Sequence, residues 1–148
     1  MADALLESGA EHLIIVDRDD DKAVALAGQL AARFPTARVE ASQPDKLPVV
    51  MPAADGLVHC TPTGHGGPSR HTAGRGAAAC RTMVADIVYR PLETGLLRAA
   101  RAAGCRVMHG GHMAVHQAAD TLRLVTGREP DVVRMLRMLR PFGRRQPS

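Results

Sequence analysis

Two kinds of hydrophobic pattern alternate along this chain. Short apolar runs bounded by Gly, Pro or acidic residues predict buried strands at 12–17, 37–41, 56–60, 82–89 and 105–109. Stretches in which apolar side chains recur every three or four positions predict helices at 1–8, 19–34, 93–103, from 112 onward, and at 131–140. This order predicts an α/β protein with a mostly parallel, doubly wound sheet and helices on both faces.

The segment 84–91 is central to this arrangement. Asp86 interrupts its apolar run, Tyr89 is the only tyrosine of the chain, and Pro91 cannot continue a strand ladder. Ligands of open α/β sheets lie at the carboxyl ends of the strands. The helix, strand and helix that follow are expected to bring Gln117 back to the same edge.

Composition excludes several classes of protein. A chain of 148 residues that is 45% hydrophobic can bury a core, but it has only three aromatic residues, too few for a surface that stacks on bases. The net charge of +4 comes from residues 128–148, where six arginines face two acids, so no basic patch is expected elsewhere. No nucleic-acid partner is predicted.

The cysteines and the hydrophobic runs favour a cytoplasmic protein. None of the three cysteines belongs to a C-x-x-C pair, which is typical of reduced thiols. No apolar run is long enough to span a bilayer, and no signal peptide is recognisable. The sequence leaves the oligomeric state open, and a homodimer is one arrangement to test.

Asp17 is the first candidate for ligand binding. It ends a predicted strand directly before a helix, where a dinucleotide-binding fold places the acid that accepts a hydrogen bond from the adenosine ribose. The alternative is an acid that caps the helix, but Asp19 is better placed for that. Asp17 favours NAD, whereas the neighbouring Arg18 could pair with the 2′-phosphate of NADP.

The glycine-rich fingerprint G-x-G-x-x-G of such a fold is missing. It would lie upstream of the helix that begins this chain, so we expect a Rossmann-like sheet that lacks its first strand and glycine-rich turn. The missing strand would lie between those at 13–17 and 56–60. We expect these two strands either to close up or to leave unpaired backbone groups that lower the stability.

Other candidates for chemistry are weaker. The turn Thr61-Pro62-Thr63-Gly64 follows a strand and could face a ligand, although a turn without a ligand would use the same residues. His112 and His116 have a spacing that can hold zinc, but no Glu follows His112 as H-E-x-x-H requires, so no metal site is predicted. Neither lysine of the chain lies where a general base would be expected.

Three segments together resemble the carboxyl-terminal domain of shikimate dehydrogenases. They are His-Cys-Thr-Pro-Thr-Gly at 59–64, Asp-Ile-Val-Tyr-Arg-Pro-Leu-Glu-Thr at 86–94 and Gly-Gly-His-Met-Ala-Val-His-Gln-Ala-Ala-Asp at 110–120, with Thr126-Gly127 and Pro130-Asp131 after them. The resemblance covers essentially the whole chain. Asp17 matches the aspartate that goes with NAD in the quinate/shikimate branch.

The resemblance implies roles for individual residues. Tyr89 and Gln117 match positions that contact the hydroxy-acid substrate, a small molecule. The cofactor, NAD or NADP, would be contacted by Asp17, Arg18, Thr61, Pro62, Thr63, Ile87, Gly110 and Met113. Two departures are His59-Cys60 in place of Asn-Ala and Gly111-His112 in place of Leu-Gly.

The resemblance also implies an activity and its limit. The family transfers hydride between NAD(P) and a 3-dehydro or 3-hydroxy cyclohexene or cyclohexane carboxylate of the shikimate pathway. Its catalytic lysine and aspartate belong to an amino-terminal domain that this chain lacks, so no catalytic residue is predicted here. Residues 1–148 are expected to form a single, partial dinucleotide-binding domain of a truncated enzyme that is inactive alone. The alternative is a non-catalytic nucleotide-binding or interaction module.

Overall fold

The structure is a computed structural model that describes residues 1–61 and 81–139. It consists of two compact units, Met1–Ala53 and Ala54–Ser148, and each is described by itself. All strand pairs among the described residues are parallel, which confirms the predicted α/β class.

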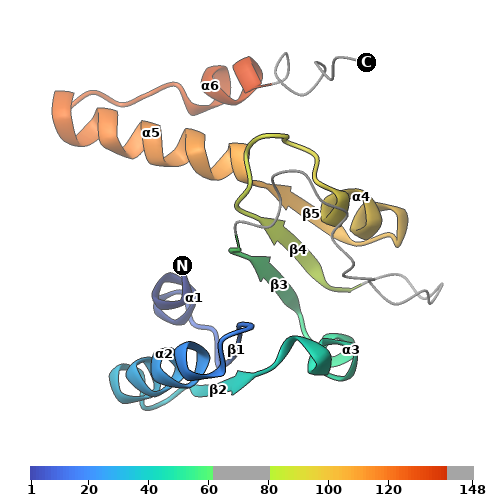
Figure 1. The fold of residues 1–148 in the computed structure, drawn as a ribbon. Coiled ribbons are helices and arrows are strands. Elements are labelled where there is room, and N and C mark those ends of the chain that lie inside the picture. The colour runs from blue at the N-terminus through green and yellow to red at the C-terminus, as the bar shows by residue number, and fades with distance from the viewer. Residues whose placement is uncertain (62–80, 140–148) are drawn as a thin grey trace. The chain divides into compact units, whose positions relative to one another are not determined.

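The first unit is a two-stranded sheet with a helix packed on it (Figure 1). Its elements are α1 (Ala2–Glu7), β1 (His12–Val16), α2 (Asp20–Arg33) and β2 (Arg38–Ser42). The strands pair from His12 with Arg38 to Val16 with Ser42. The helix α2 buries Ala23, Ala27 and Leu30, a spacing of three to four residues that presents one face to the sheet.

A short helical connection ends this unit. It comprises η1 (Pro44–Lys46), α3 (Leu47–Val50) and η2 (Met51–Ala53). Prolines at the first turns of η1 and α3 suit these short elements, because the first turn of a helix needs no N–H from its proline.

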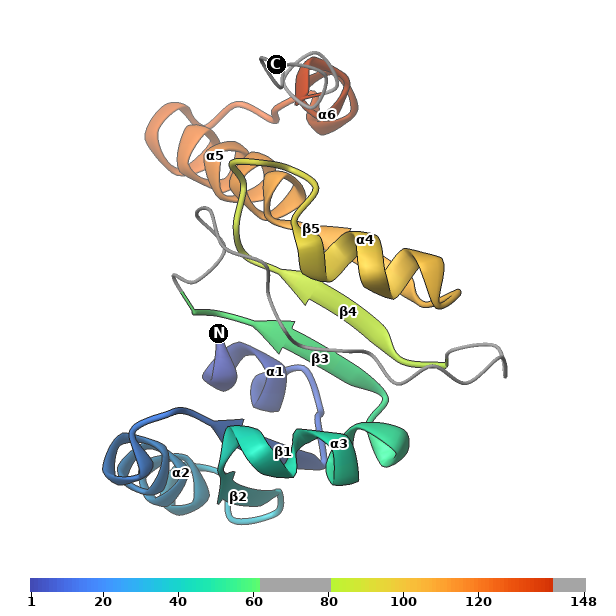
Figure 2. The ribbon, with the colours of Figure 1, turned by 45° about the vertical axis from the view of Figure 1, so that its right-hand side comes forward.

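The second unit is a three-stranded parallel sheet in the order β3-β4-β5. Its elements are β3 (Gly56–His59), β4 (Met83–Asp86), α4 (Gly95–Ala102), β5 (Arg106–His109), α5 (Gly110–Thr126) and α6 (Val132–Leu139). Figures 1 and 2 show α4 lying along β4 and β5.

The core of the second unit lies between α4 and its sheet. Leu96, Leu97 and Ala100 of α4 pack with Val84 and Cys105. Cys105 is disulfide-bonded, so the prediction of a reduced thiol is wrong at this position. Spacing along the chain does not show which cysteines folding brings together.

Strand β4 ends at Asp86, three residues before the predicted end. The amide of Ile87 still donates to the His59 carbonyl at 3.1 Å, but the amide of Val88 donates instead to the Asp86 carboxylate at 3.0 Å. This local bond takes the backbone out of the ladder, so Tyr89 lies in the loop that follows.

Strands β1 and β3 each have one strand neighbour in the described chain, β2 and β4 respectively. Because β1 and β3 belong to different units, the alternative that these two strands close up stays a prediction. Each of the two strands has one edge without a strand partner among the described residues. Within the described residues, no helix is long and apolar enough to cross a membrane.

Candidate functional site

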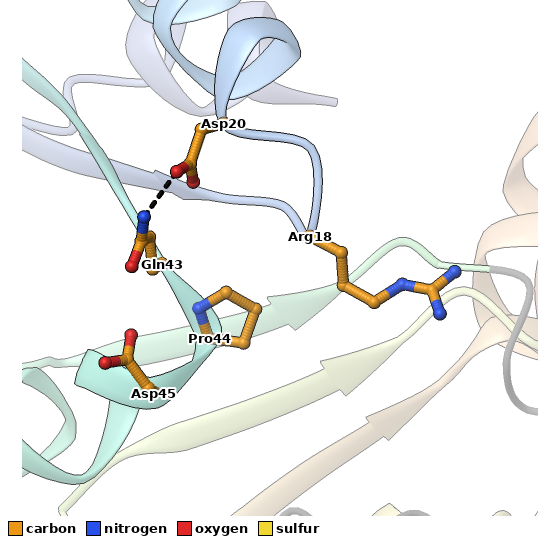
Figure 3. A pocket seen from close by; sticks show the side chains of 5 residues that line it. All are labelled: Arg18, Asp20, Gln43, Pro44 and Asp45. Atoms are coloured by element: carbon orange, nitrogen blue, oxygen red, sulfur yellow. Dashed lines mark hydrogen bonds between the residues drawn. The ribbon is translucent and has the colours of Figure 1, made fainter.

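A pocket lies beyond the carboxyl ends of β1 and β2 (Figure 3). Its volume is about 350 Å³, and it is lined by Arg18, Asp20, Gln43, Pro44 and Asp45. The side-chain amide of Gln43 donates a hydrogen bond to the Asp20 carboxylate. Figure 3 shows the Arg18 side chain extending away from this pair. The pocket therefore has an acidic side and a basic side.

Asp17 and Asp19 perform different tasks beside this pocket. Asp19 caps α2, because its carboxylate accepts the Lys22 amide at 3.2 Å. The Lys22 ammonium pairs with it at 2.9 Å, and this hydrogen bond lowers the Asp19 pKa. Asp17 accepts the Asp19 amide at 3.0 Å through Oδ1 only. The cap is thus Asp19, as predicted.

The residues of this first unit fit the adenosine half of a dinucleotide. A volume of about 350 Å³ lies in the range of small-molecule sites. Carboxylate oxygens of Asp17 and Asp20 are suitable acceptors for ribose hydroxyls. Arg18, which makes no ion pair with any described residue, could instead meet a phosphate. The sequence analysis missed Asp20, Gln43 and Asp45 as lining residues.

The second candidate site lies at the carboxyl edge of the other sheet. The registers place His59 opposite Asp86 and Asp86 opposite His109, and each of the three is the last residue of its strand. Asp86 is only 2% exposed. Three parallel strands thus present titratable side chains at one edge, where ligands of such sheets lie.

Asp86 accepts three hydrogen bonds from three separate segments. The Val88 amide and His59 Nδ1 lie 3.0 and 3.1 Å from its Oδ1, and the Thr94 hydroxyl donates to Oδ2 at 2.7 Å. Thr94 also caps α4 by accepting the Leu97 amide at 3.3 Å. The sequence singled out Asp86 only as an interruption of an apolar run.

The start of α5 packs directly on the loop after β4. A Cβ atom on Gly110 would lie 2.2 Å from the Ile87 carbonyl oxygen and 2.8 Å from the Val88 carbonyl carbon. Only glycine permits this approach. Ile87 and Gly110, both predicted beside the nicotinamide, are therefore brought together.

The other predicted residues of this edge lie on α5 and in the flanking loops. Met113 and Gln117 follow Gly110 by three and seven residues, which puts them on one face of α5. Tyr89 is 59% exposed, and Gln117 is also exposed. Thr61 Oγ1 lies 2.6 Å from His59 Nε2. Pro62 and Thr63 lie outside the described residues.

The histidines show no metal cluster in the described residues, where no group of three potential ligands occurs. The rings of His109 and His112 lie 4.3 Å apart. Burial, and then the charge of His112, lowers the pKa of His109. This contact therefore favours a neutral His109.

Comparisons with known proteins identify relatives of this chain. No family model matches the chain. A shikimate dehydrogenase (NADP(+)) of Arthrobacter sp. (strain FB24) is 48% identical over 135 residues, 91% of this chain and 46% of that protein. A quinate/shikimate dehydrogenase (NAD(+)) of Corynebacterium efficiens is 40% identical over 141 residues, 91% and 48% of the two chains. The structure of quinate dehydrogenase from Corynebacterium glutamicum in complex with NAD matches with a TM-score of 0.77 and 37% identity, over 93% and 49% of the two chains.

The parallel α/β fold and these relatives place the chain among homologues of one half of dinucleotide-dependent dehydrogenases. More particularly, the chain is homologous to part of the shikimate dehydrogenase family, which includes the quinate/shikimate dehydrogenases. It spans about half the length of the curated relatives that it matches.

Proposed function

We propose that this chain forms the cofactor-binding part of a shikimate or quinate dehydrogenase. The observation that carries the proposal is the 48% identity to a shikimate dehydrogenase over 91% of the chain. In such a reaction NAD(P) accepts or returns a hydride at the carbinol carbon of a cyclic hydroxy acid, and the protein orients both molecules.

The two candidate sites would have complementary roles. In the first unit, Asp17 and Arg18 would face the adenosine ribose beside the pocket that Arg18 and Gln43 line. In the second unit, Ile87, Gly110 and Met113 would line the nicotinamide, together with the turn at Thr61, Pro62 and Thr63. The resemblance assigns the substrate contacts to Tyr89 and Gln117, and both side chains are exposed.

We propose NAD as the preferred cofactor. Two of the five residues that line the pocket are acids and one is basic, and Asp17 adds a third carboxylate next to them. A ribose hydroxyl can donate to these oxygens, whereas a 2′-phosphate would be repelled by them. A relative at 48% identity is an NADP(+) enzyme and one at 40% an NAD(+) enzyme, so relatives alone do not decide the choice.

Calorimetric titration of the chain with NAD and with NADP tests this proposal. We expect binding of NAD, and binding of NADP that is at least about tenfold weaker, equivalent to about 1.4 kcal/mol. Binding of neither nucleotide would contradict the proposed function. Tighter binding of NADP would contradict only the cofactor preference.

The isolated chain is proposed to bind cofactor without turning over substrate. The resemblance assigns the catalytic lysine and aspartate to another domain, and Lys22 and Lys46 belong to α2 and η1 of the first unit. A non-catalytic nucleotide-binding module is the competing function, and the two are separated by the chimera described in the Discussion.

A further inference from the structure

The buried pair of His59 and Asp86 is a feature of the second unit that the proposed function does not use. The two residues face each other in the register of β3 and β4, with Nδ1 and Oδ1 3.1 Å apart. Their exposed fractions are only 8% and 2%. A buried ionisable pair of this kind is costly unless its hydrogen bonds are made, so its bonding pattern is informative.

The bonds of Asp86 determine how His59 is oriented. A carboxylate only accepts hydrogen bonds, and Asp86 already accepts from the Val88 amide and the Thr94 hydroxyl. His59 must therefore donate to it from Nδ1. In a neutral imidazole, Nε2 then carries the lone pair, and the Thr61 hydroxyl at 2.6 Å donates to it.

The result is a directed chain of hydrogen bonds from Thr61 through His59 to Asp86. Its far end is firmly held, because Thr94 joins Asp86 to the first turn of α4. That helix is packed into the core through Leu97, which is 1% exposed. This series of hydrogen bonds thus links the turn after β3 to the buried core of the unit.

We infer that His59 is a positioning residue for the cofactor: it holds the Thr61 side chain in the one orientation in which that side chain contacts the nicotinamide end. This inference rests on the proposed function, which puts Thr61 beside the cofactor. In this role His59, which is 8% exposed, would act without touching cofactor or substrate itself. Its effect on binding passes through Thr61, whereas a histidine that only stabilised the sheet would act independently of Thr61.

A double-mutant cycle on the full chain separates these roles. The affinity for NAD is measured by calorimetry for wild type, His59→Ala, Thr61→Val and the double variant. Each single change is expected to weaken binding about tenfold, since each removes the same positioned contact. The double variant should then also be about tenfold weaker. A double variant about a hundredfold weaker overturns the inference, because independent effects multiply. Unchanged affinity in His59→Ala overturns it as well.

Conservative variants keep the test decisive if His59→Ala does not fold. The side-chain oxygen of Gln can take the position of Nε2, so His59→Gln is expected to retain NAD affinity within about threefold. If His59→Gln lost as much NAD affinity as Thr61→Val does, the inference would be overturned. Thr126→Val is the matched control, because the Thr126 hydroxyl donates to the Leu122 carbonyl at 2.7 Å near the end of α5. It should leave affinity unchanged.

The same titrations distinguish this inference from the proposed function. If wild type binds neither NAD nor NADP, the proposed function fails and the inference fails with it. If wild type binds NAD but the two substitutions act independently, only the role of His59 is refuted.

Discussion

Asp17 holds the Asp19 amide with one carboxylate oxygen, while its other oxygen makes no hydrogen bond in the described chain. Asp17 can therefore shape the turn before α2 and accept from a ribose hydroxyl at once. The two functions proposed for this residue from its position are compatible.

Substitution of Asp17 by Ala tests the ribose contact. We expect NAD affinity to fall about tenfold and the preference for NAD over NADP to narrow, since an acceptor and a negative charge are lost. The matched control is Asp21→Ala, which removes an equal charge from the first turn of α2, four residues after Asp17. If Asp17→Ala and Asp21→Ala lowered NAD affinity equally, the loss would come from the change in net charge, and the ribose contact of Asp17 would be contradicted.

His109 predicts a pH dependence of stability. Burial lowers its pKa in the folded protein below the ordinary value of about 6.5. The unfolded chain then binds the proton more tightly, so the stability present above about pH 6.5 is lost as the pH falls below it. Urea unfolding at about pH 7.5 and pH 5 measures this loss, which His109→Asn should reduce. The exposed His116 supplies the control, His116→Asn, and equal pH slopes in His109→Asn and wild type would argue against this role.

At the scale of the elements, the packing of α5 against the loop after β4 requires glycine at position 110. Gly110→Ala would put a methyl group against the backbone of Ile87, so we expect a loss of about 1–3 kcal/mol in the free energy of unfolding. Gly28→Ala in α2 has no atom within 4 Å of the new methyl group and should instead stabilise by about 0.5–1 kcal/mol. Urea unfolding followed by circular dichroism gives both values. If both substitutions changed the free energy of unfolding in the same direction, the close packing at Gly110 would be contradicted.

Helix α4 depends on its cap. Thr94→Ala removes the bond to the Leu97 amide and leaves one oxygen of Asp86 without its donor. We expect a loss of about 2 kcal/mol in the free energy of unfolding, combining both effects. The exposed Thr121, whose hydroxyl bonds only the Gln117 carbonyl, gives the control Thr121→Ala, which should change stability by less than about 0.5 kcal/mol. A loss no larger than that of the control would show that the cap is not needed.

The sequence predicted those features of the elements that depend on neighbours along the chain. The strand at 12–17, the helix at 19–34 and its cap by Asp19 follow from local periodicity and capping chemistry, and the structure confirms them. The contact of Asp86 with His59 and the lining of the pocket by Gln43 could not be predicted, because both join segments more than twenty residues apart. The early end of β4 has a local cause instead, because the Asp86 carboxylate accepts the Val88 amide and takes it out of the ladder, a competition that the apolar pattern does not show.

At the scale of the whole molecule, the chain corresponds to about half of its relatives. We predict that purified chain oxidises neither shikimate nor quinate when NADH or NADPH formation is followed by absorbance. A chimera that joins it to the remaining half of the Arthrobacter sp. relative should oxidise one of them. A chimera that binds NAD but remains inactive would favour the non-catalytic module, and turnover by the chain alone would refute the predicted inactivity.

Asp86 also has a consequence for how the second unit opens. One carboxylate is the common partner of an amide after β4, a ring on β3 and the hydroxyl that begins α4. Loss of that carboxylate releases all three at the same moment. The amide protons of Val88 and Leu97 should therefore exchange with solvent deuterium at matched rates, as members of one cooperative opening event.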